Sequence, residues 1–173
     1  MLPYVRCLAE ALKAPVHLLR VKDLKTMDLS SKGLQGSDYL NDVASSFLPS
    51  LTVRCSVEIG KPAEVIVETA AQDPGTLITM ATRGRSGIQR WLSGSVAHEV
   101  FHAAQNPLLS VRATPERRPS DSVELKTIVA LLDGSPVPEK ILPHVLEIGK
   151  ALKSGVVLVR AYSLPRGIPT EGL

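Results

Sequence analysis

Apolar residues along this chain alternate between two spacings. Short runs rich in Val, Ile and Leu are followed by segments in which apolar residues recur every three or four positions, the pattern of an amphipathic helix. Strands and helices that alternate with short connections predict an α/β fold with a parallel or mostly parallel sheet. The expected strands cover residues 16–21, 52–59, 76–82, 107–113, 125–132 and 156–161.

Capping residues and prolines set the expected helix ends. Ser37 or Asp38 can cap the second helix, and Pro62 fits the first turn of the third. Residues 23–37 show little periodicity, which predicts a loop. The expected helices cover residues 3–13, 38 to about 48, 62 to about 72, 95–104 and 138–153.

Composition narrows the class of protein. Hydrophobic residues make up 44% and charged residues 21% of the 173 positions, the balance of a globular protein. Aromatic residues are only 3%, so the core must be aliphatic, which favours a buried parallel sheet. No apolar run approaches ~18 residues, so no membrane partner is expected. The net charge is +3 without a long Lys/Arg run, and no nucleic-acid partner is expected either.

The two cysteines, Cys7 and Cys55, are too few for a disulfide scaffold. Both fit as small hydrophobic residues, one on a helix and one in a strand. A reducing, cytoplasmic location is the simplest setting for such a chain.

A polar segment with two prolines, residues 114–124, is the best candidate for a domain linker. When the chain is shifted by 140 residues, positions 1–22 align with 141–162 without a gap, and nine positions are identical. This predicts a duplication. The first repeat, residues 1–113, would lack its first strand, and the second, residues 125–173, would end before its own glycine segment. The chain would then be a window cut from a longer tandem protein.

The segment Thr82-Arg83-Gly84-Arg85-Ser86-Gly87, with Gly94-Ser95-Val96 after it, lies between an expected strand and an expected helix. Glycine lets the backbone approach a ligand closely, and the N–H groups of the first helical turn carry partial positive charge. Such a connection commonly holds a phosphate group. The arginines could pair with phosphates or lie in solvent.

Residues 98–102 match the H-E-x-x-H pattern of zinc proteases, with both imidazoles on one helix face. The helix is expected to end near Asn106-Pro107, and no third ligand follows at a usual spacing, because Glu116 lies in the linker. A surface histidine pair is the simpler interpretation. No Ser/His/Asp or Cys/His set compels a nucleophile, so neither a catalytic residue nor a metal site is predicted.

Several motifs, in matching order and spacing, resemble those of universal stress proteins. The strongest is the segment from Met80 to Val96 with its glycine pattern, and Asp133-Gly134-Ser135 follows a strand as in that family. Gly60-Lys61-Pro62 and the strand after Asn106-Pro107 also match. The resemblance implies a three-layer α/β fold with a five-stranded parallel sheet, of the adenine nucleotide alpha hydrolase-like type.

ATP-binding members of that family carry G-x-x-G, nine residues, and then G-S/T. Gly84, residues 85–93 and Gly94-Ser95 match, whereas Ala81 replaces the first glycine, which is tolerated if φ there is negative. By this resemblance the ligand would be ATP, possibly with Mg. Gly84 would lie near the ribose and phosphates, and Asp133 of the second repeat would stand for the aspartate of the first strand. The implied nucleotide-binding residues are Val21, Met80, Ala81, Gly84, Gly94, Ser95, Val96 and Asp133.

The resemblance implies a regulatory, ATP-binding stress protein with at most slow ATP hydrolysis. The alternative is a nucleotide-free module that uses the same fold for dimerisation, which Ala81 and the missing first strand favour. An enzyme of the related superfamily, such as an ATP pyrophosphatase or a synthetase, would need S-G-G-x-D-S or H-I-G-H loops, and neither is present.

The missing strand makes a structural prediction. In the family the first strand lies at the centre of the sheet, so its absence leaves unpaired edges on strands 16–21 and 76–82. Strand 125–132 is expected to fill the gap, either in the same chain or by exchange between two chains. The expected assembly is therefore a homodimer or an intramolecular pairing of repeats.

Overall fold

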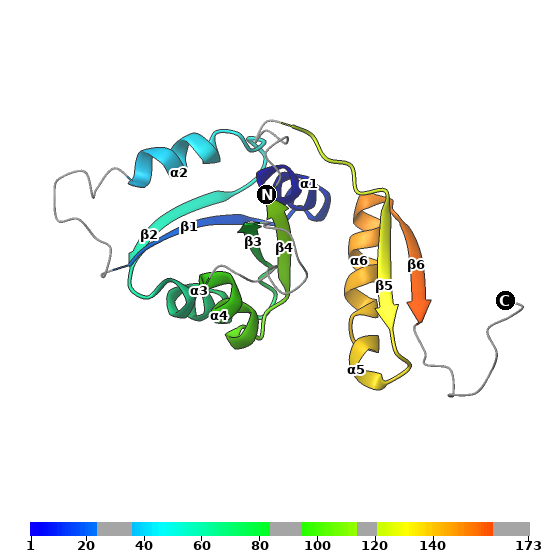
Figure 1. The fold of residues 1–173 in the computed structure, drawn as a ribbon. Helices are drawn as coiled ribbons and strands as arrows, with labels where there is room; N and C mark the ends of the chain where they lie inside the picture. Colours follow the sequence, from blue (N-terminus) through cyan, green and yellow to red (C-terminus); the bar gives the residue numbers. More distant parts are fainter. Residues whose placement is uncertain (24–35, 84–94, 114–120, 161–173) are drawn as a thin grey trace, which may run out of the picture. The chain divides into compact units, whose positions relative to one another are not determined.

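The computed structural model describes residues 1–23, 36–83, 95–113 and 121–160. They form two compact units, unit 1 (Met1–Val123) and unit 2 (Glu124–Leu173). Helices and strands alternate along unit 1, as the periodicity predicts (Figure 1). Its helices are α1 (Leu2–Leu12), α2 (Gly36–Ala44), α3 (Pro62–Ala71) and α4 (Ser95–Ala103). Its strands are β1 (Val16–Lys22), β2 (Val53–Ile59), β3 (Ile78–Arg83) and β4 (Leu108–Ala113).

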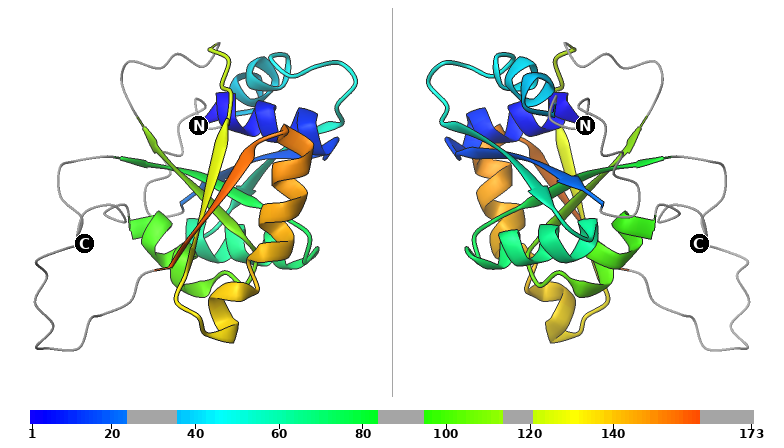
Figure 2. Two further views of the ribbon diagram at one scale, coloured as in Figure 1. Left: turned by 90° about the vertical axis from the view of Figure 1, so that its right-hand side faces the viewer. Right: turned by 90° about the vertical axis from the view of Figure 1, so that its left-hand side faces the viewer.

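Strands in unit 1 pair in parallel, which confirms the predicted direction. β1 pairs with β2, with Val16 opposite Val53, and β3 pairs with β4, with Ile78 opposite Leu108. In the described part of the chain these are separate two-stranded sheets (Figure 2). The prediction of one five-stranded sheet is therefore wrong for the described residues.

Unit 2 is a strand–helix–strand unit. β5 (Thr127–Leu132) pairs in parallel with β6 (Gly155–Arg160), and α6 (Leu142–Leu152) runs beside them (Figure 1). The short helix α5 (Pro136–Glu139) precedes α6.

β5 pairs with β6 within unit 2. β6 follows β5 through one helical crossover, which is the usual connection between parallel neighbours. Completion of the first sheet by β5, in the same chain or by exchange between two chains, stays a prediction.

The described residues of unit 1 form two hydrophobic clusters. The first gathers α3, β3 and α4 around Val100, which has no exposed surface. The second gathers α1, β1 and the end of the α2 segment around Ala9, Val16 and Phe47. Each pair of strands thus has its own small core.

Helix α2 ends at Ala44, short of the predicted Leu48. The hydroxyls of Ser45 and Ser46 donate to the carbonyl oxygens of Asp42 and Val43 at 2.7 and 2.6 Å. Serine side chains that bond the preceding turn compete with helix continuation. Ser37 and Asp38 lie inside the helix, which begins at Gly36, so neither caps it as predicted.

The single helix predicted for residues 138–153 is wrong, because the segment forms α5 and α6 with a turn between them. Pro143 lies in the first turn of α6. Proline is tolerated there because its missing N–H needs no helical partner, but it cannot continue a helix from before.

Candidate functional site

The glycine segment connects a strand end to a helix start. β3 ends at Arg83 and α4 begins at Ser95, both in unit 1. Gly84 and Gly94 lie outside the described residues. Val96 packs against the cluster of α3 and β3, which fixes the first turn of α4 on unit 1. The N–H groups of such a turn can bind an anion.

The other predicted nucleotide residues lie on different elements. Met80 and Ala81 are neighbours in β3, and Met80 packs against the same cluster as Val96. Ala81 is exposed, and the described residues with positive φ other than glycine are Lys13 and Lys153. Ala81 is not among the residues with positive φ, so alanine is tolerated in place of the family's first glycine. Val21 lies near the end of β1, opposite Glu58, in the other sheet of unit 1.

Asp133 belongs to unit 2 and directly follows β5. The backbone N–H of Ser135 donates to Asp133 Oδ1 at 2.7 Å, and Gly134 adopts φ 86° in this turn. The hydrogen bonds from Ser135 hold the pKa of the Asp133 carboxyl below its usual value. This carboxylate is thus ionised near neutral pH, the form that binds Mg²⁺.

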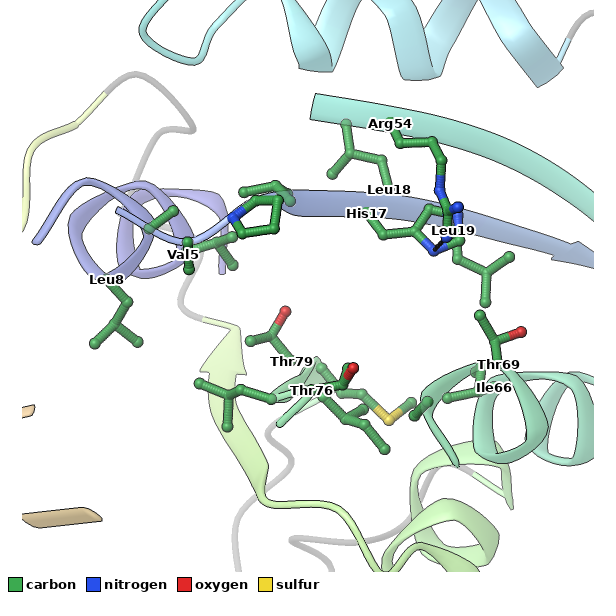
Figure 3. A pocket seen from close by; sticks show the side chains of 18 of the residues that line it. Val5, Leu8, His17, Leu18, Leu19, Arg54, Ile66, Thr69, Thr76 and Thr79 are labelled. Carbon is green, nitrogen blue, oxygen red and sulfur yellow. Dashed lines mark hydrogen bonds between the residues drawn. The ribbon is translucent and has the colours of Figure 1, made fainter. Parts of the chain in front are cut away.

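A cavity of about 810 Å³ lies between β1 and β3 in unit 1 (Figure 3). Val5 and Leu8 of α1 line one end and Ile66 and Thr69 of α3 line the other (Figure 3). β1 and β3 form opposite walls. Most of the lining is apolar. Sequence reasoning did not predict this lining, which depends on helix placement.

His17 and Arg54 line this cavity and form a polar group with Ser56 of β2, which sequence reasoning missed. The Arg54 guanidinium lies 3.1 Å from His17 Nδ1, and His17 Nε2 lies 2.8 Å from Ser56 Oγ. Arginine can only donate, so Nδ1 accepts and Nε2 carries the proton that Ser56 receives. Sequence reasoning could not find this group, because His17 and Arg54 lie opposite each other only when β1 and β2 pair in this parallel register.

Stability is expected to fall between pH 8 and pH 5 partly through His17. Burial, and then the Arg54 charge, lower the pKa of His17 below 6.5, against a smaller opposing effect of Glu58. The unfolded chain therefore takes up this proton at higher pH than the folded chain, and stability is lost as the pH falls through that window. Urea unfolding at pH 8 and pH 5 measures the loss. His17→Gln should reduce it; a loss of stability that His17→Gln leaves unchanged would contradict the assignment.

The H-E-x-x-H residues lie on α4, with the rings of His98 and His102 stacked edge-on at 4.4 Å. The two histidines line a shallow cavity together with Glu64 and Glu68 of α3. Within residues 1–23, 36–83, 95–113 and 121–160, no three metal-ligating side chains are placed to hold a metal ion. Both cysteines are free thiols, and Cys55 donates to the Leu40 carbonyl at 3.6 Å.

Helices alternate with parallel strands, and a glycine-rich sequence connects β3 to α4. These features define the chain as an α/β protein. The sequence model of the universal stress protein family matches residues 4–112. The chain belongs to this family. No helix in the described ranges has the length and apolar character needed to cross a bilayer.

Three curated relatives agree with this assignment. A universal stress protein of Methanocaldococcus jannaschii is 45% identical over 53 residues, 31% of this chain and 31% of the relative. One of Synechocystis sp. is 39% identical over 57 residues, 32% of this chain and 53% of the relative. One of Methanothermobacter thermautotrophicus is 30% identical over 101 residues, 56% of this chain and 68% of the relative. The chain thus spans about a third and about half of the first two relatives.

Proposed function

We propose that this universal stress protein binds ATP and acts as a regulatory, cytoplasmic stress-response protein. The observation that supports this proposal is the position of the glycine pattern in the chain. The pattern begins at Gly84, directly after β3, and continues through the nine residues 85–93. It ends with Gly94 and Ser95, and Ser95 is the first residue of α4. A strand-to-helix connection of this kind is where backbone N–H groups and the helix dipole favour phosphate.

Asp133 is the proposed second part of this site. Its ionised carboxylate would bind Mg²⁺ held by the phosphates. Val21, Met80 and Ala81 would contact the adenosine end. In this proposal the nucleotide changes conformation or partner choice, and the chain needs no catalytic residue.

The test is the nucleotide content of the purified chain. We expect mass spectrometry of the denatured protein to release ATP or a related adenine nucleotide, and calorimetry to show ATP binding by the stripped chain. Asp133→Asn keeps the oxygen that accepts the Ser135 N–H but removes the charge. It should weaken Mg-ATP about tenfold, about 1.4 kcal/mol, with unchanged thermal unfolding. Absence of both released nucleotide and calorimetric binding would refute the proposal.

A nucleotide-free dimerisation module is the second candidate. The observation in its favour is the separation of unit 1 into two sheets, since a site spread over β1 and β3 needs those strands to be joined. The same calorimetry decides between the two candidates.

A further inference from the structure

Helix α4 carries two histidines on one face, one turn apart. His98 and His102 are both exposed, and their ring centroids lie 4.4 Å apart in an edge-on arrangement. Val100, between them in the sequence, has no exposed surface and packs in the cluster that α4 shares with α3 and β3. The helix therefore brings the two imidazoles together, and the core fixes their backbone positions.

Helix α3 lies beside α4 and runs in the same direction (Figure 1). Just after α4, the side-chain amide of Asn106 donates to the carbonyl oxygens of Ala70 and Asp73 at 3.1 and 3.0 Å. These hydrogen bonds join the C-terminal ends of the two helices. One turn back along each helix from this contact are His102 of α4 and Glu68 of α3.

The shallow cavity between α3 and α4 combines an apolar part with ligating side chains. Its volume is about 620 Å³, and its apolar lining is Ala63 and Val67 of α3 and Ala103 of α4. The rest of the lining, among the residues that the structure describes, is made of two histidines and three glutamates: Glu64, Glu68, His98, Glu99 and His102. Every polar side chain there can thus bind a metal ion.

Glu68 is the carboxylate best placed to join the two imidazoles. Glu64, on the same helix, is already paired with Lys61 at 2.7 Å. Glu68 has no ion-pair partner within the described ranges, and its side chain is exposed. It can therefore turn toward His102 without breaking an ion pair.

We propose that His98, His102 and Glu68 bind a divalent transition-metal ion of the Zn²⁺ class. Two imidazoles and one carboxylate form a common ligand set for Zn²⁺, with water in the fourth position. No three ligands converge in the described side-chain positions, so binding requires Glu68 to turn and the two rings to leave their edge-on arrangement. All three side chains are exposed, which leaves room for these rotations.

The third ligand comes from the helix that precedes the histidines in the chain. A zinc protease pattern is normally completed by a residue that follows its two histidines, and the spacing of this sequence offers none. Only the packing of α3 against α4 brings Glu68 to the pair. The ion would hold α3 and α4 together and stabilise the folded chain, because it binds the folded form alone. The proposal includes no hydrolytic step.

The first test is calorimetric titration of the chain with ZnCl₂ in buffer without nucleotide. We expect one tight site per chain, with a Kd of about 10 µM or lower. His98→Ala and His102→Ala should each weaken binding at least about tenfold, and Glu68→Gln about tenfold. Cys7 and Cys55 are kept in all variants, so zinc bound by thiols would not respond to these changes.

Two matched controls separate this site from general surface binding. His144→Ala removes an exposed histidine of α6 and should leave the zinc affinity unchanged. Glu64→Gln removes a carboxylate from the same helix and cavity and should weaken binding less than Glu68→Gln, because Glu64 is paired with Lys61.

Thermal unfolding gives an independent measurement. Saturating Zn²⁺ should raise the unfolding midpoint of the unmodified chain and of His144→Ala, but not that of His98→Ala. His98 and His102 are exposed, so their replacement should leave the fold intact in the absence of metal.

Three results would overturn the proposal. They are zinc binding weaker than about 100 µM, an affinity that the changes at positions 98 and 102 leave unaltered, and equal losses for Glu64→Gln and Glu68→Gln. The last would show that Glu68 acts only through its charge. None of these measurements uses nucleotide, so the metal site can fail while the proposed ATP binding stands, and the reverse.

Discussion

Replacing Val100 by aspartate is expected to prevent unit 1 from folding. Val100 has no exposed surface and lies at the centre of the cluster formed by α3, β3 and α4. No partner for a carboxylate is described in that cluster, and an unpaired buried charge costs several kcal/mol. Domains of this size have only about 5–15 kcal/mol of stability in total, and this core is small. Circular dichroism and urea unfolding of the purified chain measure the loss.

Phe101→Asp is the matched control for this change. Phe101 is the next residue of the same helix and is 54% exposed. The same side chain there should change stability by no more than about 1 kcal/mol. Val100→Ala, which removes two methyl groups without adding charge, should cost about 2 kcal/mol and keep the fold measurable if the aspartate variant cannot be purified. Equal effects at positions 100 and 101 would show that α4 does not pack as described.

Gly94→Asp is expected to lower ATP affinity at least about a hundredfold, about 2.7 kcal/mol. In the proposed site this position faces the phosphates at the start of α4, and a carboxylate would repel them. Like charges brought together at an interface cost several kcal/mol. Calorimetric titration with Mg-ATP measures the change, and thermal unfolding checks that the variant is folded.

Gly75→Asp supplies the control for the added charge. Gly75 lies in the turn before β3, at the opposite end of the strand from the glycine segment, and its φ is not in the left-handed range. This variant should bind ATP like the unmodified chain. If both variants lose affinity equally, general charge rather than a local phosphate contact is responsible.

Local patterns determined most of the elements but not all of their ends. Short apolar runs placed each of the described strands to within about two residues, because side-chain patterning is a property of the local backbone. The errors arose where short-range hydrogen bonds or proline compete with a helix. Ser45 and Ser46 shorten α2, and Pro143 divides the predicted helix 138–153.

The candidate site was predictable in part. The glycine segment and its place between β3 and α4 follow from neighbouring residues in the chain. The group of His17, Arg54 and Ser56 does not, because these residues meet only when β1 and β2 pair in one register. The cavity between β1 and β3 depends further on where α1 and α3 pack.

The sequence by itself determined the alternation of helices and strands, the parallel direction and the 140-residue correspondence between α1–β1 and α6–β6. Each of these rests on local spacing or on identity between segments. Only the tertiary structure decided that β5 pairs with β6 and, among the described residues, that β1 pairs with β2 and β3 with β4 in separate sheets. Apolar strands of similar composition can pair with several partners. The choice among them follows from loop closure and from which helix covers each face, and neither is written in a single segment.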